Sequence, residues 1–222
     1  MSKELDNAFT DVRNAFRLLA RYQSRVLDII NYIREHTPYT DMWGVKRYSD
    51  IIHTRRDCPD RDYANLSVWK DMWSWDFMYN YMFEFYFGQA KIERKTIEMS
   101  VIQVSDDGFY RSMANNPSPT DISTFLPANE SNSYLIFTAG WNAWLRDEVE
   151  DNYEAFLHKF LAQSKDVCVY KNEKGHWSIT KRYPMQRFAS QKEADQVISD
   201  FGKLVKDHAG INLFNNYCLC FH

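Results

Sequence analysis

The chain has few of the residues that break or staple a fold. Its 222 residues include 7 glycines, 6 prolines and 4 cysteines. Low glycine and proline contents exclude collagen-like, low-complexity and disordered chains. Four unevenly spaced cysteines are too few for a disulfide scaffold. We therefore expect a densely packed globular protein with reduced cysteines.

The sequence also lacks a strong charge, a long apolar run and a signal segment. With 27 basic and 30 acidic residues, the net charge of -3 gives no global field that would attract nucleic acid. No stretch approaches the roughly 20 apolar residues of a membrane span, and no apolar run follows a basic segment near the start. These absences predict a cytoplasmic protein that binds neither nucleic acid nor a membrane.

Signatures of known catalytic chemistry are missing as well. The chain has no Gly-x-Ser-x-Gly elbow, no phosphate-binding glycine-rich loop and no dinucleotide fingerprint. Cys218, Cys220 and His222 lie close together, and Cys58 with His53 could complete a zinc site. Their spacing differs from the two-residue gaps that structural zinc usually shows, and buried free cysteines are common. We therefore assign no metal and no cofactor to the chain.

Aromatic residues are what the sequence has in abundance, at 16% of the chain. Every odd position from Trp73 to Phe87 is aromatic, and this period of two predicts a long central strand with one face of rings. Residues 96 to 105 alternate again and complete an antiparallel hairpin through a connection at 89 to 95. The Asp106-Asp107-Gly108 turn would use glycine's positive φ and lead into a further strand at 109 to 111.

The first 37 residues carry a heptad pattern. Apolar residues recur at alternating spacings of four and three, interrupted only by Gln23, at Leu5, Phe9, Val12, Phe16, Leu19, Val26, Ile30 and Ile33. This seam predicts one helix that ends before Pro38 and is roughly 50 Å long, which is more than a compact domain needs. Two interpretations remain open: a core helix that lies across the sheet, or a coiled-coil arm that pairs with itself or a partner.

The remaining segments complete an α+β protein. Strands are expected at 134–139, 167–171 and 177–183, helices at 141–160 and 190–210, and an edge strand in the tail. Ser190 with Glu193 forms a capping box, and Gly210 is the C-cap of the last helix. Residues 39–65 read as a connection, and 112–132 as a long loop that is a candidate site by position.

The predicted fold class is therefore α+β, with a mostly antiparallel sheet of a meander plus a hairpin. Helices are expected to pack on one face of this sheet, and a long amphipathic helix forms the N-terminus. Residues 1–37 form this helix, which is a possible arm. Residues 38–222 form a single α+β domain.

The first functional hypothesis is a non-catalytic interaction or accessory protein of bacterial or phage origin. It would bind a partner protein or self-associate through the N-terminal helix and an aromatic-rich surface. Tryptophan and tyrosine are favoured at interfaces because they bury a large area while keeping one polar atom paired. The predicted contact residues are Phe9, Phe16, Ile30, Trp43 and Trp69.

The alternative hypothesis is a metal-dependent hydrolase or nuclease that uses Glu84, Glu98, Asp106 and Asp107. A hairpin loop centred near residue 91 would place Glu84 opposite Glu98, and carboxylates on adjacent strands can hold Mg²⁺. Like charges directly opposite each other destabilise a sheet, however. The enzyme hypothesis requires these acids to converge in one cleft, whereas the interaction hypothesis requires exposed apolar residues on the helix.

Overall fold

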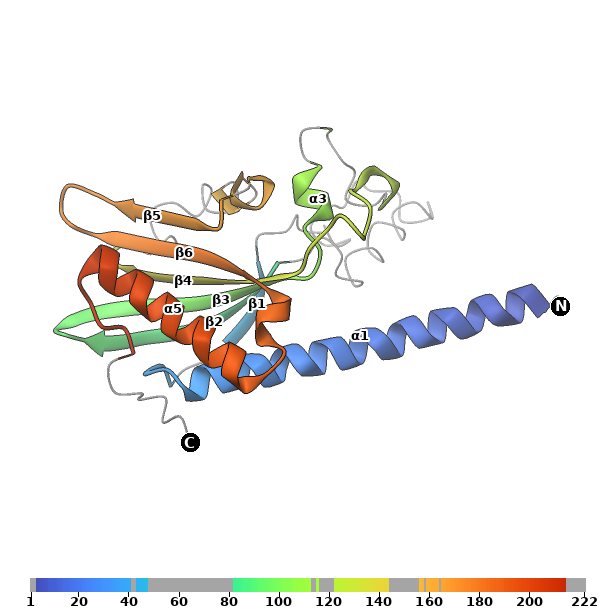
Figure 1. The fold of residues 1–222 in the computed structure, drawn as a ribbon, viewed down its shortest axis with the longest axis horizontal. Helices are drawn as coiled ribbons and strands as arrows, with labels where there is room; N and C mark the ends of the chain where they lie inside the picture. Colours follow the sequence, from blue (N-terminus) through green and yellow to red (C-terminus); the bar gives the residue numbers. More distant parts are fainter. Residues whose placement is uncertain are drawn as a thin grey trace, which may run out of the picture.

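A computed structural model of the chain describes residues 3–40, 43–47, 82–112, 115, 122–143, 156–157, 159–163 and 165–214. Within these residues the chain forms an antiparallel six-stranded sheet in the order β1-β2-β3-β4-β6-β5. The strands are β1 (Trp43–Arg47), β2 (Met82–Ile92), β3 (Lys95–Val104), β4 (Tyr134–Trp141), β5 (Val167–Lys171) and β6 (Trp177–Pro184). The α-helices are α1 (Lys3–Glu35), α3 (Gly108–Arg111) and α5 (Gln191–Ala209), with 3-10 turns η2 (Ile122–Thr124) and η3 (Met185–Phe188). The predicted α+β class is confirmed (Figure 1).

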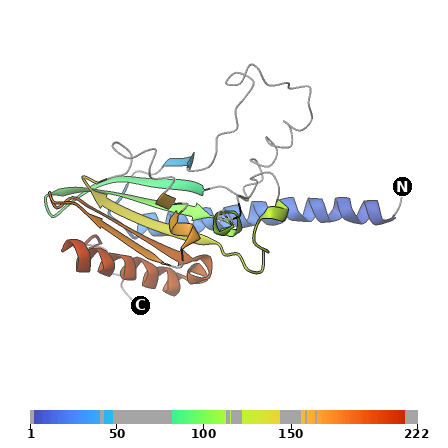
Figure 2. The ribbon, with the colours of Figure 1, turned by 90° about the horizontal axis from the view of Figure 1, so that it is seen from above.

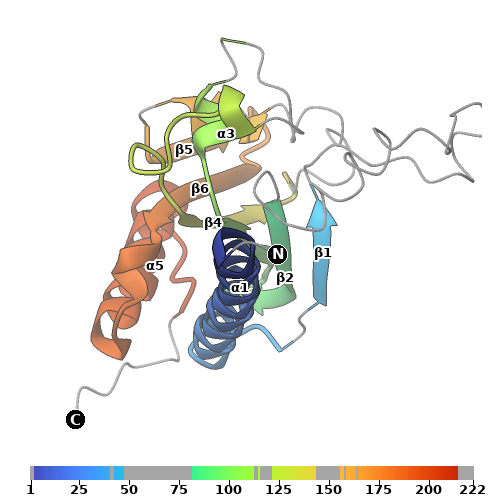
Figure 3. The same cartoon turned by 90° about the vertical axis from the view of Figure 1, so that its right-hand side faces the viewer.

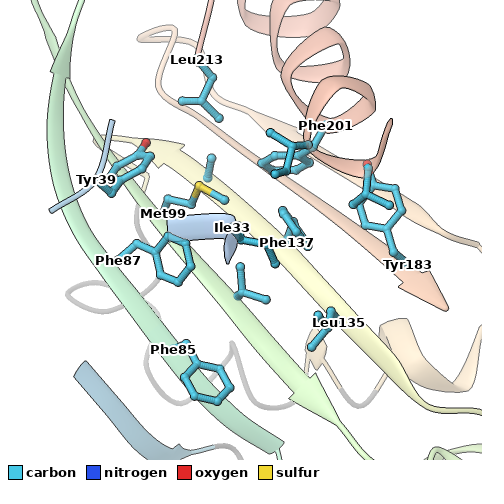
Figure 4. Packing of buried hydrophobic residues seen from close by; sticks show 14 of the residues in the cluster. Ile33, Tyr39, Phe85, Phe87, Met99, Leu135, Phe137, Tyr183, Phe201 and Leu213 are labelled. Carbon is cyan, nitrogen blue, oxygen red and sulfur yellow. The ribbon is translucent and has the colours of Figure 1, made fainter. Parts of the chain in front are cut away.

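The two long helices pack side by side on one face of the sheet (Figures 1 and 3). Ile33 of α1 and Phe201 of α5 meet Phe87 of β2 and Phe137 of β4 in one buried cluster (Figure 4). The strand residues in this cluster recur at every second position, as expected for one face of a pleated sheet. Large apolar side chains therefore fix both helices to the sheet.

The opposite face of the sheet is buried too. Met82, Ile102 and Ile136 alternate with the first set and pack with Phe109 of α3 and Phe160 of a short helical segment. The alternation of the aromatic strand predicts one face of rings and one more polar face. In β2 both faces are buried, because elements on each side cover the sheet.

The local predictions for the last helix and the last hairpin are confirmed. The Ser190 hydroxyl accepts the Glu193 backbone N–H at 3.3 Å, and α5 ends at Gly210 with a φ of 71°. Strands β5 and β6 pair around the turn at 172–175, where Gly175 has a φ of 78°. Short-range capping and turn chemistry decided these elements, so they could be recognised from the sequence.

Strand β2 runs further than predicted. The expected connection at 89–95 is mostly strand, because Gly88 has a φ of 83° and forms a bulge rather than ending the strand. The hairpin turns instead at Glu93 and Arg94, which both have positive φ values, 49° and 70°. Paired positive φ values of this kind belong to a tight two-residue hairpin turn.

The strand predicted at 109–111 is wrong, since this segment is the helix α3. The Asp106 carboxylate accepts the Gly108 N–H at 2.7 Å, so the predicted turn exists, but Gly108 does not have a positive φ. A Cβ at Gly108 would lie 2.5 Å from Ser131 Oγ and 3.1 Å from the Leu126 carbonyl oxygen. Glycine is needed here for close packing, and the chain continues as a helical turn.

Two other predictions agree with the structure only in part. Strand β1 lies in the segment expected to be a connection, and residues 211–214 form no strand, although Ile211 and Leu213 are buried. Trp69, the aromatic positions 73–81, His53, Cys58 and the cysteines and histidine of the tail lie outside the described residues. No helix in the described ranges is both long and apolar enough to cross a membrane.

Candidate functional site

Helix α1 divides into two parts at Tyr22. Every residue from 4 to 21 is exposed, whereas from Tyr22 onward one side of the helix is covered. The exposed part extends beyond the sheet, with the N-terminus at its far end (Figures 1 and 2). We call residues 3–21 the arm and residues 22–35 the anchor.

The anchor is fixed by apolar packing and by hydrogen bonds to three parts of the body. Ile30 and Ile33 are completely buried against the sheet. Tyr22 Oη donates to Ser105 Oγ at 3.3 Å, Arg25 donates to the Phe188 carbonyl oxygen at 3.2 Å, and Tyr32 Oη donates to Asp195 Oδ1 at 2.7 Å. These bonds define where the arm begins.

The tyrosine at the α1–α5 contact is electrostatically coupled to its acceptor. Burial, together with the hydrogen bond to Asp195 and the charge of its carboxylate, raises the pKa of Tyr32 to about 12. The neutral phenol is the form that donates this hydrogen bond. The contact between anchor and α5 therefore holds throughout the ordinary pH range.

The arm presents the same heptad seam as the anchor, but to solvent. The exposed fractions of its seam residues are 41% for Leu5, 49% for Phe9, 50% for Val12, 48% for Phe16 and 42% for Leu19. Two hydrogen bonds join polar side chains of the arm to its own helix. Thr10 donates to the Asp6 carbonyl oxygen, and Arg13 donates to Thr10 Oγ1. A continuous apolar stripe thus leaves the body along one side of a helix.

The predicted contact residues separate into groups. Phe9 and Phe16 lie on the exposed seam, together with Leu5, Val12 and Leu19, which belong to the same heptad pattern but were not singled out. Ile30, by contrast, is completely buried in the cluster that α1 forms with the sheet, so the described structure does not expose it to a partner. Trp43 lies in β1 and its side chain, like all of Trp69, is outside what the structure describes.

The carboxylates of the alternative hypothesis do not face one another. Because the hairpin turns at Glu93 and Arg94 and not near residue 91, Glu84 pairs with Ile102 and Glu98 pairs with Gln89. Glu84 Oε1 accepts the Ser100 hydroxyl at 2.6 Å. Glu98 accepts Tyr86 Oη at 3.2 Å and Gln89 Nε2 at 2.6 Å. Each glutamate is therefore held by neutral donors of its own sheet.

The two aspartates shape the turn after β3. Asp107 Oδ1 accepts the Asn132 N–H at 2.8 Å and lies 3.8 Å from the Arg111 guanidinium, while Asp106 accepts from Gly108. Burial raises the pKa of Asp107 despite the opposing effects of Asn132 and Arg111. Within the described parts of the chain, no three His, Cys, Asp or Glu side chains form a group that could hold a metal ion. These contacts give the aspartates a structural role.

Comparison with known proteins places the chain in a family. No curated protein and no solved structure matches it. The family model PM0109 matches residues 2–210, which include the arm, the anchor and the sheet. The chain belongs to the PM0109 family.

Proposed function

We propose that this protein is a non-catalytic assembly protein whose N-terminal arm binds another helix through its apolar seam. One observation carries the proposal. A single heptad seam runs the length of α1, and its residues are buried from Val26 onward but 41 to 50% exposed from Leu5 to Leu19. The body uses this seam in the anchor, and a second helix would use it in the arm.

The energetics of the arm support a partner. Burying a large apolar side chain stabilises by about 1.5–3 kcal/mol, so covering five half-exposed seam residues is strongly favourable. A helix of this length is marginal in water when no tertiary contact supports it. Residues 4–21 are all exposed, so the described part of the body covers little of the arm. A second helix packed on the seam would supply it.

The form of the stripe favours a helix as the bound element. Spacings of four and three place the seam residues at the two core positions of a heptad, which interlock with the same positions of another helix. The sequence immediately beside the seam includes Ala8 and Ala15, whose small side chains permit a close approach. An extended peptide would not match this repeat.

The test measures whether the seam is covered in the cell. Val12→Cys places a thiol on the seam, and Asn14→Cys places one on the exposed opposite side of the same helix turn. Cells that produce either variant from its natural locus are treated with a membrane-permeable maleimide, and labelling at each position is measured by mass spectrometry. The purified variants are labelled in parallel.

The proposal predicts that the thiol of Val12→Cys reacts at least about tenfold more slowly in cells than the thiol of Asn14→Cys, because a bound helix excludes the reagent. Equal labelling rates at the two positions in cells would overturn the proposal. Slow labelling of position 12 that persists in the purified protein identifies a second copy as the partner. Protection that is lost on purification identifies a different protein.

A further inference from the structure

The charges beside the seam indicate which helix the arm binds. We infer that the arm pairs with the arm of a second copy of this chain in an antiparallel coiled coil. This inference rests on the proposed function and specifies the partner, its direction and its register. It follows from the order of charged and small residues along the exposed arm.

The arm is acidic near its N-terminus and basic toward the body. Glu4, Asp6 and Asp11 occupy its first part, with Lys3 as the single basic residue there, while the second part carries Arg13, Arg17 and Arg21. Two arms in parallel would align the arginines of one copy with those of the other. Two antiparallel arms place the acidic part of each beside the basic part of the other, which is electrostatically favourable.

The heptad positions of the charges fix the register. Asp6 and Arg13 both directly follow a seam residue, Leu5 and Val12 respectively, and so lie on the same side of the seam one heptad apart. In an antiparallel pair, positions on this side face the same positions of the other helix. When Phe9 packs against Val12 of the second copy, Asp6 lies beside Arg13 of the second copy, and the two-fold axis repeats this pair.

The other side of the seam agrees with this register. Ala8 and Ala15 directly precede the seam residues Phe9 and Phe16, and the same register brings Ala8 beside Ala15 of the second copy. Two alanine pairs let the helices approach closely on this side, while two ion pairs flank the other. Shifting the register by one heptad would instead set Arg13 against Arg13 of the second copy, or Asp6 against its own counterpart.

The length of the arm also fits. In this register residue 9 faces residue 12 of the second copy, so the numbers of facing residues sum to 21. Residue 3 therefore lies level with residue 18 of the second copy. The two arms then overlap along almost their whole exposed length. Lys3, the first described residue of each arm, then lies before Tyr22 of the second copy, where the anchor contacts its own body. The two sheets therefore lie at opposite ends of the pair.

The experiment is a charge-reversal cycle on the full chain, with the dissociation constant measured by sedimentation equilibrium. The variants are Asp6→Arg, Arg13→Asp and the double variant. The matched controls are Asp11→Arg and Arg17→Asp, which make the same charge changes at positions that point away from the seam. Circular dichroism confirms that each variant remains helical.

The inference predicts that the wild type dimerises and that Asp6→Arg and Arg13→Asp each raise the dissociation constant about tenfold, because each converts two attractive pairs into two repulsive ones. The double variant should return to within about threefold of the wild type, and each control should change the constant by less than about threefold. The antiparallel register would be overturned if the double variant raised the dissociation constant by the product of the two single-variant factors.

A wild type that is monomeric at every concentration would overturn self-association. That result would not decide the proposed function, which the labelling experiment in cells tests separately. Equal labelling rates at positions 12 and 14 would overturn the proposed function. The two failures are therefore distinguishable.

Discussion

Phe9 and Ile30 occupy the same position of the heptad, three repeats apart on one helix, yet Phe9 is 49% exposed and Ile30 is completely buried. The difference arises from what covers each residue. Ile30 packs with Phe85 and Phe137 of the sheet in one cluster, whereas Phe9 lies in the part of α1 that extends past the sheet. One seam therefore serves the fold at one end and remains open at the other.

This division predicts effects of very different size on stability for the same type of substitution. Ile30→Ala should lower the free energy of unfolding by about 2–5 kcal/mol, because it leaves a cavity in the core. Phe9→Ala should change it by less than about 0.5 kcal/mol when the protein is dilute, because its side chain is exposed. Urea unfolding at low protein concentration measures both. A loss above about 2 kcal/mol for Phe9→Ala would mean that the arm is part of the core.

The hydrogen bond from Tyr32 to Asp195 predicts a dependence on alkaline pH. The pKa of Tyr32 is raised to about 12 in the folded protein, against 10.0 for an ordinary tyrosine. Below pH 10 both states keep the proton, and the stabilisation is complete. Between pH 10 and about 12 the unfolded state loses its proton first, so the stabilisation declines as pH rises.

Tyr32→Phe should remove this contribution. The difference in unfolding free energy between the wild type and Tyr32→Phe should therefore shrink across that pH range, as measured by urea unfolding at each pH. Tyr170→Phe, at an exposed tyrosine of β5, is the control and should follow the wild type. A difference that stays constant up to pH 12 would contradict the assigned role of the Tyr32 phenol.

Truncation of the Arg182 side chain in β6 should lower the stability of the fold. Its guanidinium is buried, donates to Asp166 Oδ1 and to the Gln163 carbonyl oxygen at 2.8 Å each, and lies 5.1 Å from the centre of the Tyr134 ring. Arg182→Met should cost about 1–3 kcal/mol because it removes the donors of a buried guanidinium, which also lie 3.4 Å from the carbonyl oxygens of the buried residues Phe160 and Leu161.

Arg182→Lys should recover less than half of that loss, since one ammonium group cannot reproduce the planar fork of donors. Lys203→Met, at an exposed position of α5, is the control and should change stability by less than about 0.5 kcal/mol. Thermal unfolding of the three variants checks the order. Equal stability of Arg182→Lys and the wild type would show that charge alone suffices at this position.

Local sequence signals predicted much of the fold. The capping box at Ser190 and Glu193 and the turn ending at Gly175 are interactions within a few residues, and both were found as expected. The bulge at Gly88 was missed because a glycine inside an alternating pattern is compatible with either a strand end or an extra residue. The pairing of the whole hairpin decides between them.

The predicted site residues depended on strand pairing and on what covers each residue, which local sequence signals do not show. The hairpin turns at Glu93 and Arg94, later than the predicted centre near residue 91, so Glu84 and Glu98 do not oppose each other, and local sequence signals did not reveal this. For α1 the heptad pattern correctly identified an apolar seam, but a period shows which side of a helix is apolar and not what covers it. The burial of Ile30 and the exposure of Phe9 required the position of the sheet.

We propose above that the arm is an assembly surface between two copies of the chain. Amide hydrogen exchange across α1, measured over a range of protein concentrations, tests it most directly. The amides of residues 22–35 should exchange slowly at every concentration. Those of residues 4–21 should exchange slowly in concentrated protein and fast on dilution. Phe9→Glu with Val12→Glu should make the arm exchange fast at every concentration, whereas Asn7→Glu with Asn14→Glu, on the opposite side, should not. Fast exchange of residues 4–21 in the wild type at all concentrations would contradict the claim.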